Sequence, residues 1–477
     1  MHSHDVKDVA NGEVLDALRA AHDRILGELV EFASIPSIST DPAHSADMLA
    51  AAAWVANKLS AAGPISVRTI TTPGNPIVYG EWLGAPGKLT VLIYGHYDVQ
   101  PPDPLEKWTS APFTPTVRDG RLYARGVSDD KGPMLIPIKV AEAFFATEGT
   151  LPVNVKFMFE GEEEIGSQNL ESFIAQHTEL LAADFVLSAD GAMWRINEPS
   201  LTVAGRGLAG LEFTVTASRK DLHSGRHGGG VANPLHAIAR LVASLHDDHG
   251  RIAVEGFYDS VRELTAAERT AIAALPFDEQ AYLTQVGAPD VFGERGYSTL
   301  ERQWTRPTIE VNGMWGGYEG PGQKTVIPSE AHAKITCRLV PDQSPRDVIA
   351  AVTRHLESRV PAGTTLTVSA DDHGAWPAHI DGNHFALAAA NEALHAVYGV
   401  HPLVVRMGGT VPISELFQRH MQLDTVFFRF STADEDYHAP DEFFRVHRLH
   451  EGLEAWARIW RILGDTSPTS PRNEITT

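Results

Sequence analysis

The sequence contains a single cysteine, Cys337. One thiol cannot form a disulfide within the chain, and it excludes a metal site built on several thiolates. Because structural disulfides belong to oxidising compartments, their absence makes the cytoplasm the expected location.

Long apolar runs and basic charge are also scarce. No apolar run approaches the ~18 residues needed to cross a bilayer, and the N-terminus lacks the apolar core of a signal peptide. Lys and Arg total 39 against 61 for Asp and Glu, which gives a formal net charge of −22. A field of this sign repels phosphate backbones and anionic lipid heads. We therefore expect neither nucleic acid nor a membrane as a partner.

The rest of the composition is typical of a globular protein. Hydrophobic residues make up 43% and charged residues 21% of the 477 residues. A chain of this length exceeds what a single hydrophobic core usually fills, so two or three domains are expected.

Strand-like and helical segments alternate in the first part of the chain. Helical spacing of apolar residues predicts one helix over 14–32 and another over 46–62. Three apolar segments, LTVLIYGH, VNVKFMFE and ADFVLSAD, then end at His96, Glu160 and Asp190. Strands separated by helices indicate a parallel sheet, and such sheets bind ligands at the carboxyl ends of their strands.

The pattern changes near Gly205. Segments such as GLEFTVTAS and AHAKITCRLV alternate apolar and polar residues, as antiparallel strands with one solvated face do. Helices and buried strands return after about Gly382. The sequence thus predicts an α/β protein whose mostly parallel sheet domain is interrupted by an inserted α+β domain. The expected parts are a discontinuous first domain, an insertion and a disordered tail, at 1–205 with 382–465, 206–381, and 466–477.

His96 and Asp98 follow the first apolar strand. Residues i and i+2 of a strand share a face, so both can act at one site while Tyr97 points away. A carboxylate beside an imidazole orients the ring as a metal ligand. A surface ion pair at a strand end would explain the two residues equally well.

Two acidic clusters follow. ARGVSDDKG brings Asp129 and Asp130 to the start of a helix, where acids also serve as N-caps. FEGEEEIGS places Glu162, Glu163 and Glu164 directly after a strand. Like charges this close raise carboxyl pKa values unless a cation lies among them, although a solvated helix start could also carry them.

The last candidate ligands are Asp190, which follows the third strand, and His438, which lies among five acids in DEDYHAPDE. Two histidines and several carboxylates thus arrive at the ends of elements of one sheet. This set favours two divalent cations such as zinc or manganese. A cation pair about 3.5–4 Å apart activates water for hydrolysis and needs a separate carboxylate to move the proton.

From the first helix to about Leu463, the sequence resembles the carnosinase-like dipeptidases of the aminoacylase and carboxypeptidase G group of di-metal peptidases. The motifs YGHYDVQPP, RGVSDDKGP, EGEEEIGS, DLHSG, GGYEGPGQKTVIP, RLVP and GGTVP occur in the family's order. The resemblance implies the fold of di-zinc exopeptidases, with a catalytic first domain and an inserted lid and dimerisation domain.

The resemblance also implies a ligand set. Asp129 would bridge two divalent cations per subunit, zinc or manganese, and a cis peptide bond would follow it. His96 and Asp190 would complete the ligands of one cation, and Glu164 and His438 those of the other.

Two further roles are implied near these ligands. Glu163 would be the general base that takes a proton from water and returns it to the leaving amine, and Asp98 would orient His96. His223 of DLHSG would stabilise the oxyanion in the partner subunit's site, which implies a homodimer through the inserted domain.

The substrate's C-terminal carboxylate would be bound by Arg338, beside Gly409 and Thr410. Thr410 stands where related enzymes often have serine. Without the resemblance, Arg338 would be interpreted as a solvent-facing residue on an alternating strand.

The expected function is therefore metal-dependent hydrolysis of dipeptides with a free C-terminus. The alternatives are an N-acyl amino acid deacylase or a carboxypeptidase of the same family and, from another class, a non-catalytic binding protein on this fold. A nucleotide-binding loop at GYEGPGQKT is rejected because Gln323 stands where such a loop requires lysine.

Overall fold

The structure is a computed structural model that describes residues 4–370, 374–410 and 412–466. It forms two compact units. Unit 1 comprises Met1–Val203, Ile380–Val404 and Leu416–Thr477, and unit 2 comprises Ala204–His379 and Val405–Glu415. The predicted tail, 466–477, lies outside the described residues except for Thr466.

The division of the chain differs from the expected domains at residues 405–415. The sequence placed this segment with the first domain, whereas it clusters with unit 2. Hydrogen bonds explain the difference, because the Arg206 backbone N–H donates to the Gly409 carbonyl and Arg338 donates to the Thr410 hydroxyl.

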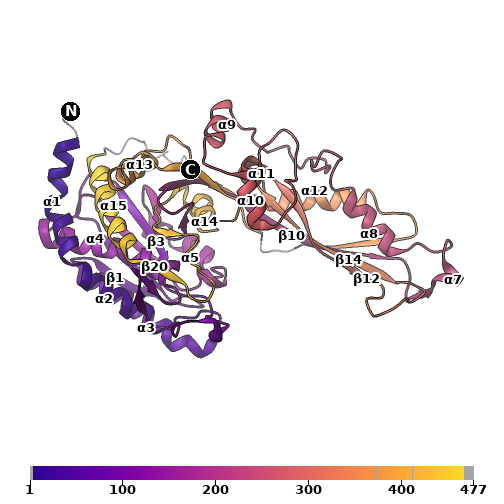
Figure 1. Cartoon of the computed structure of the whole chain (residues 1–477), viewed down its shortest axis with the longest axis horizontal. Helices are drawn as coiled ribbons and strands as arrows, with labels where there is room; N and C mark the ends of the chain where they lie inside the picture. The colour runs from indigo at the N-terminus through magenta and orange to yellow at the C-terminus, as the bar shows by residue number, and fades with distance from the viewer. Residues whose placement is uncertain (1–3, 371–373, 411, 467–477) are drawn as a thin grey trace. The chain divides into compact units, whose positions relative to one another are not determined.

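Unit 1 is built around a six-stranded sheet (Figure 1). The strand pairs β3 with β6, β3 with β7, and β7 with β18 are parallel, and the pairs β1 with β2 and β2 with β6 are antiparallel. The strands in spatial order are β1 (Ser66–Ile70), β2 (Ile77–Trp82), β6 (Asn154–Glu160), β3 (Thr90–His96), β7 (Phe185–Ser188) and β18 (Thr425–Phe427).

The apolar character of these strands follows from their position. Every residue of β6 and of β7 is buried, as is every residue of β3 after Thr90. Continuous burial is expected where helices cover both faces of a sheet. The helices that share one hydrophobic core with the sheet include α3 (Ser45–Ala62), α4 (Gly132–Glu148), α13 (Phe385–Tyr398) and α15 (Val446–Asp465).

The helix predicted over 14–32 is two helices. α1 spans His4–Ala20 and α2 spans His22–Ala33, with Ala21 between them at φ −89° and ψ 0°. After the break, the His22 ring stacks on His450 of α15 with centroids 3.2 Å apart. Packing against α15 thus accompanies a break that apolar periodicity alone does not reveal.

Unit 2 contains a four-stranded antiparallel sheet in the order β12 (Thr308–Gly316), β14 (Glu330–Leu339), β10 (Gly207–Thr216), β15 (Thr365–Ala370). Buried and half-buried residues alternate along β10, as its sequence predicts. The buried residues of β10 and β14 form one core with those of α8 (Pro234–Ala243) and α12 (Pro345–Glu357).

Short elements complete the chain. The remaining helices are α5 (Leu170–Gln176), α6 (Thr178–Leu181), α7 (Ser224–His227), α9 (Ala266–Ala273), α10 (Glu279–Val286), α11 (Thr299–Thr305) and α14 (Pro412–Met421). The remaining strands are β4 (Thr116–Arg118), β5 (Arg121–Tyr123), β8 (Ala192–Met193), β9 (Ser200–Gly205), β11 (Leu222–His223), β13 (Val326–Ile327), β16 (Ala378–His379), β17 (Leu403–Met407), β19 (Ser431–Thr432) and β20 (Phe443–Arg445).

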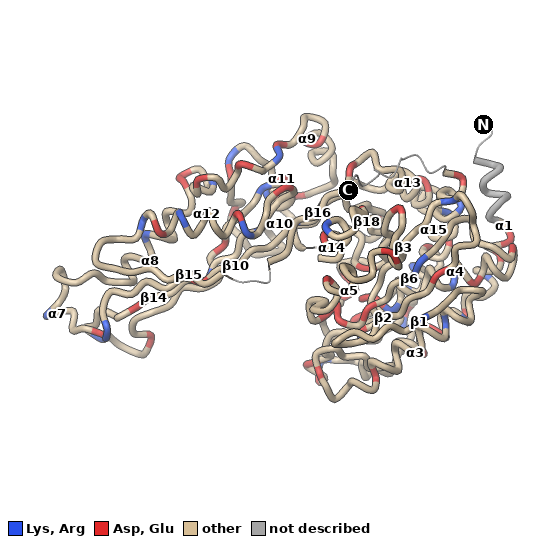
Figure 2. The backbone as a smooth tube through the Cα atoms, turned by 180° about the vertical axis from the view of Figure 1, so that it is seen from behind, with Lys and Arg blue, Asp and Glu red and all other residues tan. Residues whose placement is uncertain are grey.

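The predicted fold class is confirmed: a mixed, mostly parallel sheet in one unit and a separate antiparallel sheet in the other. Acidic residues occur in both units, and a group of them lies close to α5 in unit 1 (Figure 2). Among the described residues, no helix has the length and apolar character needed to cross a membrane.

Candidate metal centre

The candidate centre lies where strands of unit 1 end. β3 lies between β6 and β7 and is parallel to both, so their carboxyl ends share one edge of the sheet. His96 is the last residue of β3, Glu163 and Glu164 follow β6, and Asp190 follows β7. The topology therefore gathers polar side chains that are far apart in the sequence.

Five side chains, three from these strand ends together with Asp129 and His438, form two overlapping triads. In the first, His96 Nε2 lies 3.0 Å from Asp129 Oδ1 and 3.9 Å from Asp190 Oδ1. In the second, His438 Nε2 lies 3.0 Å from Asp129 Oδ2 and 3.2 Å from Glu164 Oε2. Within each triad the potential ligand atoms all lie within 4.8 Å of one another. Asp129 belongs to both and turns one carboxylate oxygen toward each.

Asp98 contacts a residue of each triad, His96 of the first and Glu164 of the second. His96 Nδ1 lies 3.1 Å from the Asp98 carbonyl oxygen and 3.4 Å from its carboxylate. The same carboxylate accepts hydrogen bonds from the backbone N–H groups of Glu163 and Glu164, at 3.3 and 3.1 Å. Because the His96 and Asp98 side chains are fully buried, the surface ion pair considered from the sequence is wrong.

The Asp129 loop is fixed by Glu442. Its carboxylate accepts from Arg125 at 2.6 Å and from the backbone N–H groups of Gly126, Ser128 and Asp129 at 2.8–3.3 Å. The peptide bond between Asp129 and the following residue is cis. Four donors on one buried carboxylate hold the turn that presents Asp129.

The alternative explanations of the acidic clusters fail in the structure. α4 has Lys131 at its N-cap position and no side-chain cap, so neither Asp129 nor Asp130 caps it. Asp130 instead accepts from the His96 backbone N–H at 3.2 Å. The side chain of Glu164 is only 3% exposed, which excludes a solvated helix start.

Three positioning residues escaped the sequence analysis. Glu442 is one, and Glu435 is another, because it accepts from the Ser128 hydroxyl at 2.7 Å. Arg429 is the third, since its Nε donates to the Asp190 carbonyl at 2.9 Å. The only sequence signal for the two glutamates is their place among the acids around His438.

Electrostatics show how crowded the carboxylates are. Burial raises the pKa of Asp190 to about 6 and that of Glu163 well above its usual range, and neighbouring acids add to both shifts. Hydrogen bonds from His438 and His96 outweigh burial and lower the pKa of Asp129. The hydrogen bonds that His438 makes to Asp129 and Glu164 raise the pKa of His438 to about 10. Each triad thus combines one imidazole nitrogen with carboxylate oxygens, the ligand types that fit a divalent cation.

The expected substrate-binding residues belong to unit 2. Arg338, which is half-buried, donates from Nη1 to the Thr410 hydroxyl at 3.0 Å. Arg206, which the sequence analysis missed, donates its backbone N–H to the Gly409 carbonyl at 2.9 Å and its Nε to the Gly408 carbonyl at 2.8 Å. Residues 408–410 are therefore held by hydrogen bonds to Arg206, which follows β9, and to Arg338, near the end of β14.

His223 lies apart from these residues in the sequence and is exposed on β11. Its Nδ1 accepts a hydrogen bond from the Gly225 backbone N–H at 3.0 Å. This contact fixes one ring nitrogen as an acceptor and leaves Nε2 as the N–H donor of the neutral ring.

The geometry agrees with a comparison against known families. Residues 92–462 match the family model described as peptidase family M20/M25/M40. The chain belongs to peptidase family M20/M25/M40. It is a hydrolase of the metallodipeptidase type, and the predicted resemblance is confirmed.

Individual relatives of this M20 family chain cover most of its length. It is 33% identical over 394 residues to the Beta-Ala-His dipeptidase of Homo sapiens, and the matched region covers 81% of this chain and 77% of the relative. It is 30% identical over 471 residues to the Cys-Gly metallodipeptidase dug1 of Schizosaccharomyces pombe, covering 96% and 98%. The structure of the M20 family metallo-carboxypeptidase Sso-CP2 from Sulfolobus solfataricus superposes with a TM-score of 0.78 at 32% identity, over 92% of this chain and 99% of that one.

Proposed function

We propose that this M20 family enzyme hydrolyses dipeptides that have a free C-terminal carboxylate. It would hold two divalent cations per subunit, zinc or manganese. The ligands of one would be His96, Asp129 and Asp190, and those of the other Asp129, Glu164 and His438. The observation that carries the proposal is the Asp129 carboxylate, which gives one oxygen to each triad.

The chemistry divides between cations and protein. Two bound divalent cations would lower the pKa of a water and polarise the scissile carbonyl. Glu163 is not part of either triad, lies among their charges, and has a pKa raised by burial, so it holds a proton more strongly than an ordinary glutamate does. Its carboxylate would accept the proton of the attacking water and then donate it to the leaving amine.

Residues of unit 2 would bind and orient the substrate. Arg338 would form a bidentate pair with the C-terminal carboxylate, assisted by the backbone of Gly409 and the hydroxyl of Thr410. His223 would donate from Nε2 to the developing oxyanion in the site of a partner subunit, so the functional form would be a homodimer through the inserted domain. The exposure of His223 supports a role outside its own subunit. The single, buried Cys337 supports a cytoplasmic location.

The names of the relatives favour dipeptides, because two of the three reported above are named as dipeptidases. The third is titled a metallo-carboxypeptidase, which keeps longer peptides as the second candidate.

The test is a substrate panel on metal-free protein reloaded with zinc, manganese or cobalt. We expect dipeptides to be cleaved faster than tripeptides and than N-acetyl amino acids with the same C-terminal residue. Turnover of the acylated compounds alone would end the dipeptidase proposal while leaving the metal centre in place. A protein that binds the cations but cleaves none of the three classes would support a binding protein instead.

A further inference from the structure

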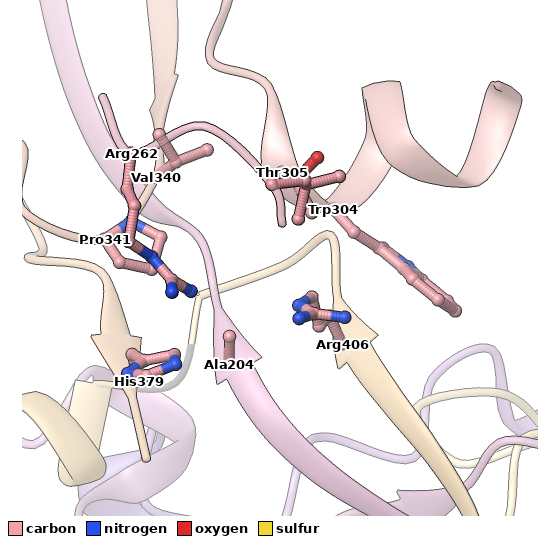
Figure 3. Close-up of a pocket in the computed structure, with 9 residues that line it drawn as sticks. Ala204, Arg262, Trp304, Thr305, Val340, Pro341, His379 and Arg406 are labelled. Atoms are coloured by element: carbon pink, nitrogen blue, oxygen red, sulfur yellow. The ribbon is translucent and has the colours of Figure 1, made fainter. Parts of the chain in front are cut away.

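A small cavity in unit 2 is lined by two arginines that have no part in the proposed reaction. Figure 3 shows Arg262, Arg406 and His379 around the methyl group of Ala204, with Trp304 at the edge. The cavity offers about 20 Å³ to the centres of water-sized molecules. One water needs roughly 10–15 Å³ by the same measure, so the cavity accepts one or two particles of that size and excludes a peptide or a nucleotide.

The two guanidinium groups share a single carboxylate oxygen. Glu268 Oε1 lies 3.0 Å from Arg262 Nη2 and 3.1 Å from Arg406 Nη2. The other oxygen, Oε2, accepts from the backbone N–H and the hydroxyl of Thr265, both at 2.9 Å, in the capping box of α9. Glu268 therefore balances only one of the two positive charges.

Among the described residues, the remaining donors of both arginines have no protein acceptor. A guanidinium carries five N–H groups, and within the described part of the chain neither Arg262 nor Arg406 makes a hydrogen bond except to Glu268. The Arg406 side chain is only 9% exposed. Burial, and then the charge of Arg262, lower the pKa of Arg406 despite Glu268. A partly buried cation in excess is unfavourable unless an anion joins it.

We propose that this cavity binds a small monovalent inorganic anion, of the size of chloride, between Arg262 and Arg406. The ion would accept the unused N–H groups of both side chains and neutralise the excess charge. Its size follows from the volume, and its sign from two guanidinium groups on one carboxylate.

The anion would also help Arg338 and Thr410 to bind the substrate's C-terminal carboxylate, an expectation that rests on the proposed function. β17 carries Arg406 and leads into Gly409 and Thr410, and β14 carries Arg338 and leads into Val340, which lines the cavity. An ion that fixes both strand ends would fix the Arg338 to Thr410 contact. Replacing gluconate by chloride at constant ionic strength should then lower KM and leave kcat unchanged.

Direct binding is tested without reference to activity. Crystals of the full chain, grown with its cations and soaked in bromide, should show an anomalous bromide peak between the guanidinium groups of Arg262 and Arg406. In solution, chloride at constant ionic strength should raise the Tm saturably by about 1–3 °C relative to gluconate. A crystal without a peak in this cavity, together with equal Tm values in the two salts, would overturn the proposal.

Variants separate this site from other anion effects. Arg406→Gln and Arg262→Gln should each abolish the chloride-dependent rise in Tm. Arg354→Gln, at an exposed position on α12, is the matched control and should retain it. Should Arg406→Gln not fold, Arg262→Gln still decides, because its side chain is 47% exposed. A chloride effect that persists in Arg262→Gln contradicts the assignment. A protein that shows the bromide peak but hydrolyses no dipeptide would instead count against the proposed function.

Discussion

The two units collect opposite charges. Unit 1 brings three carboxylates and two imidazoles together, three of the five from the carboxyl ends of buried strands, with Glu163 beside them. Unit 2 brings guanidinium groups together, Arg262 with Arg406 at the cavity and Arg338 beside the charge of Arg206. Burial penalises the charged form in both places, and it lowers the pKa of Arg206 to about 10. The two kinds of cluster match the two proposals: unit 1 would bind cations, and unit 2 would bind anions.

The largest effect is expected at Glu163, the proposed general base, which belongs to neither triad. Glu163→Gln should lower kcat by roughly 10²–10⁴-fold, because the amide cannot take up a proton. Metal content, measured by atomic emission, should stay at two cations per chain. Glu179→Gln, at an exposed position on α6, is the control and should behave as the parent enzyme. An unchanged rate in the Glu163 variant would remove this residue from the base role.

The next effect tests whether unit 2 supplies the oxyanion donor to a partner subunit. His223→Ala should lower kcat by about 10²–10³-fold, the usual loss for one oxyanion donor, with metal content unchanged. Mixing it with Glu163→Gln in exchanging dimers should restore about a quarter of the parent activity, because half of the dimers would hold one complete site. Absence of rescue in dimers that demonstrably exchange would contradict a shared site.

Arg338 tests the anion-binding side of the comparison. Arg338→Gln should raise KM about 10–100-fold for dipeptides, because a charge-assisted pair is lost. The same substrates with an amidated C-terminus should be poor for the parent enzyme and equally poor for the variant. If the variant discriminates against the amide as strongly as the parent does, another group binds the carboxylate.

An effect of similar size, on metal affinity instead of KM, is expected for Asp98, the residue proposed to orient His96 in the first triad. Asp98→Asn should weaken metal binding about 10–100-fold, as loss of a partner that orients a ligand commonly does. Competition with a chelator measures this directly. Asp16→Asn on α1, where the side chain is 77% exposed, is the control. Equal metal affinity in all three proteins would show that Asp98 does not orient His96 as a ligand.

The sequence was sufficient for the features that depend on short-range pattern. Apolar runs ending at His96 and Glu160 correctly predicted β3 and β6, because a strand covered on both faces must be continuously apolar. Alternation likewise predicted β10 and β14. The break at Ala21 was missed, since a single residue between α1 and α2 leaves the spacing of apolar residues unchanged.

The residues that hold the site in place could not be predicted in this way. Glu442 accepts from backbone N–H groups more than 300 positions away, and Arg429 donates to a backbone carbonyl 239 positions away. Arg206 likewise contacts only the backbone at Gly408 and Gly409. Backbone groups are the same in every residue, so such contacts leave no pattern of spacing or type in the sequence.

The most direct test is a crystal structure of the full chain grown with ample zinc or manganese and measured at the metal absorption edge. We predict two anomalous peaks, one within ligand distance of His96 and Asp190 and one within ligand distance of Glu164 and His438, with the Asp129 carboxylate between them. A single peak, or none at Asp129, would contradict the assignment of a two-cation hydrolase.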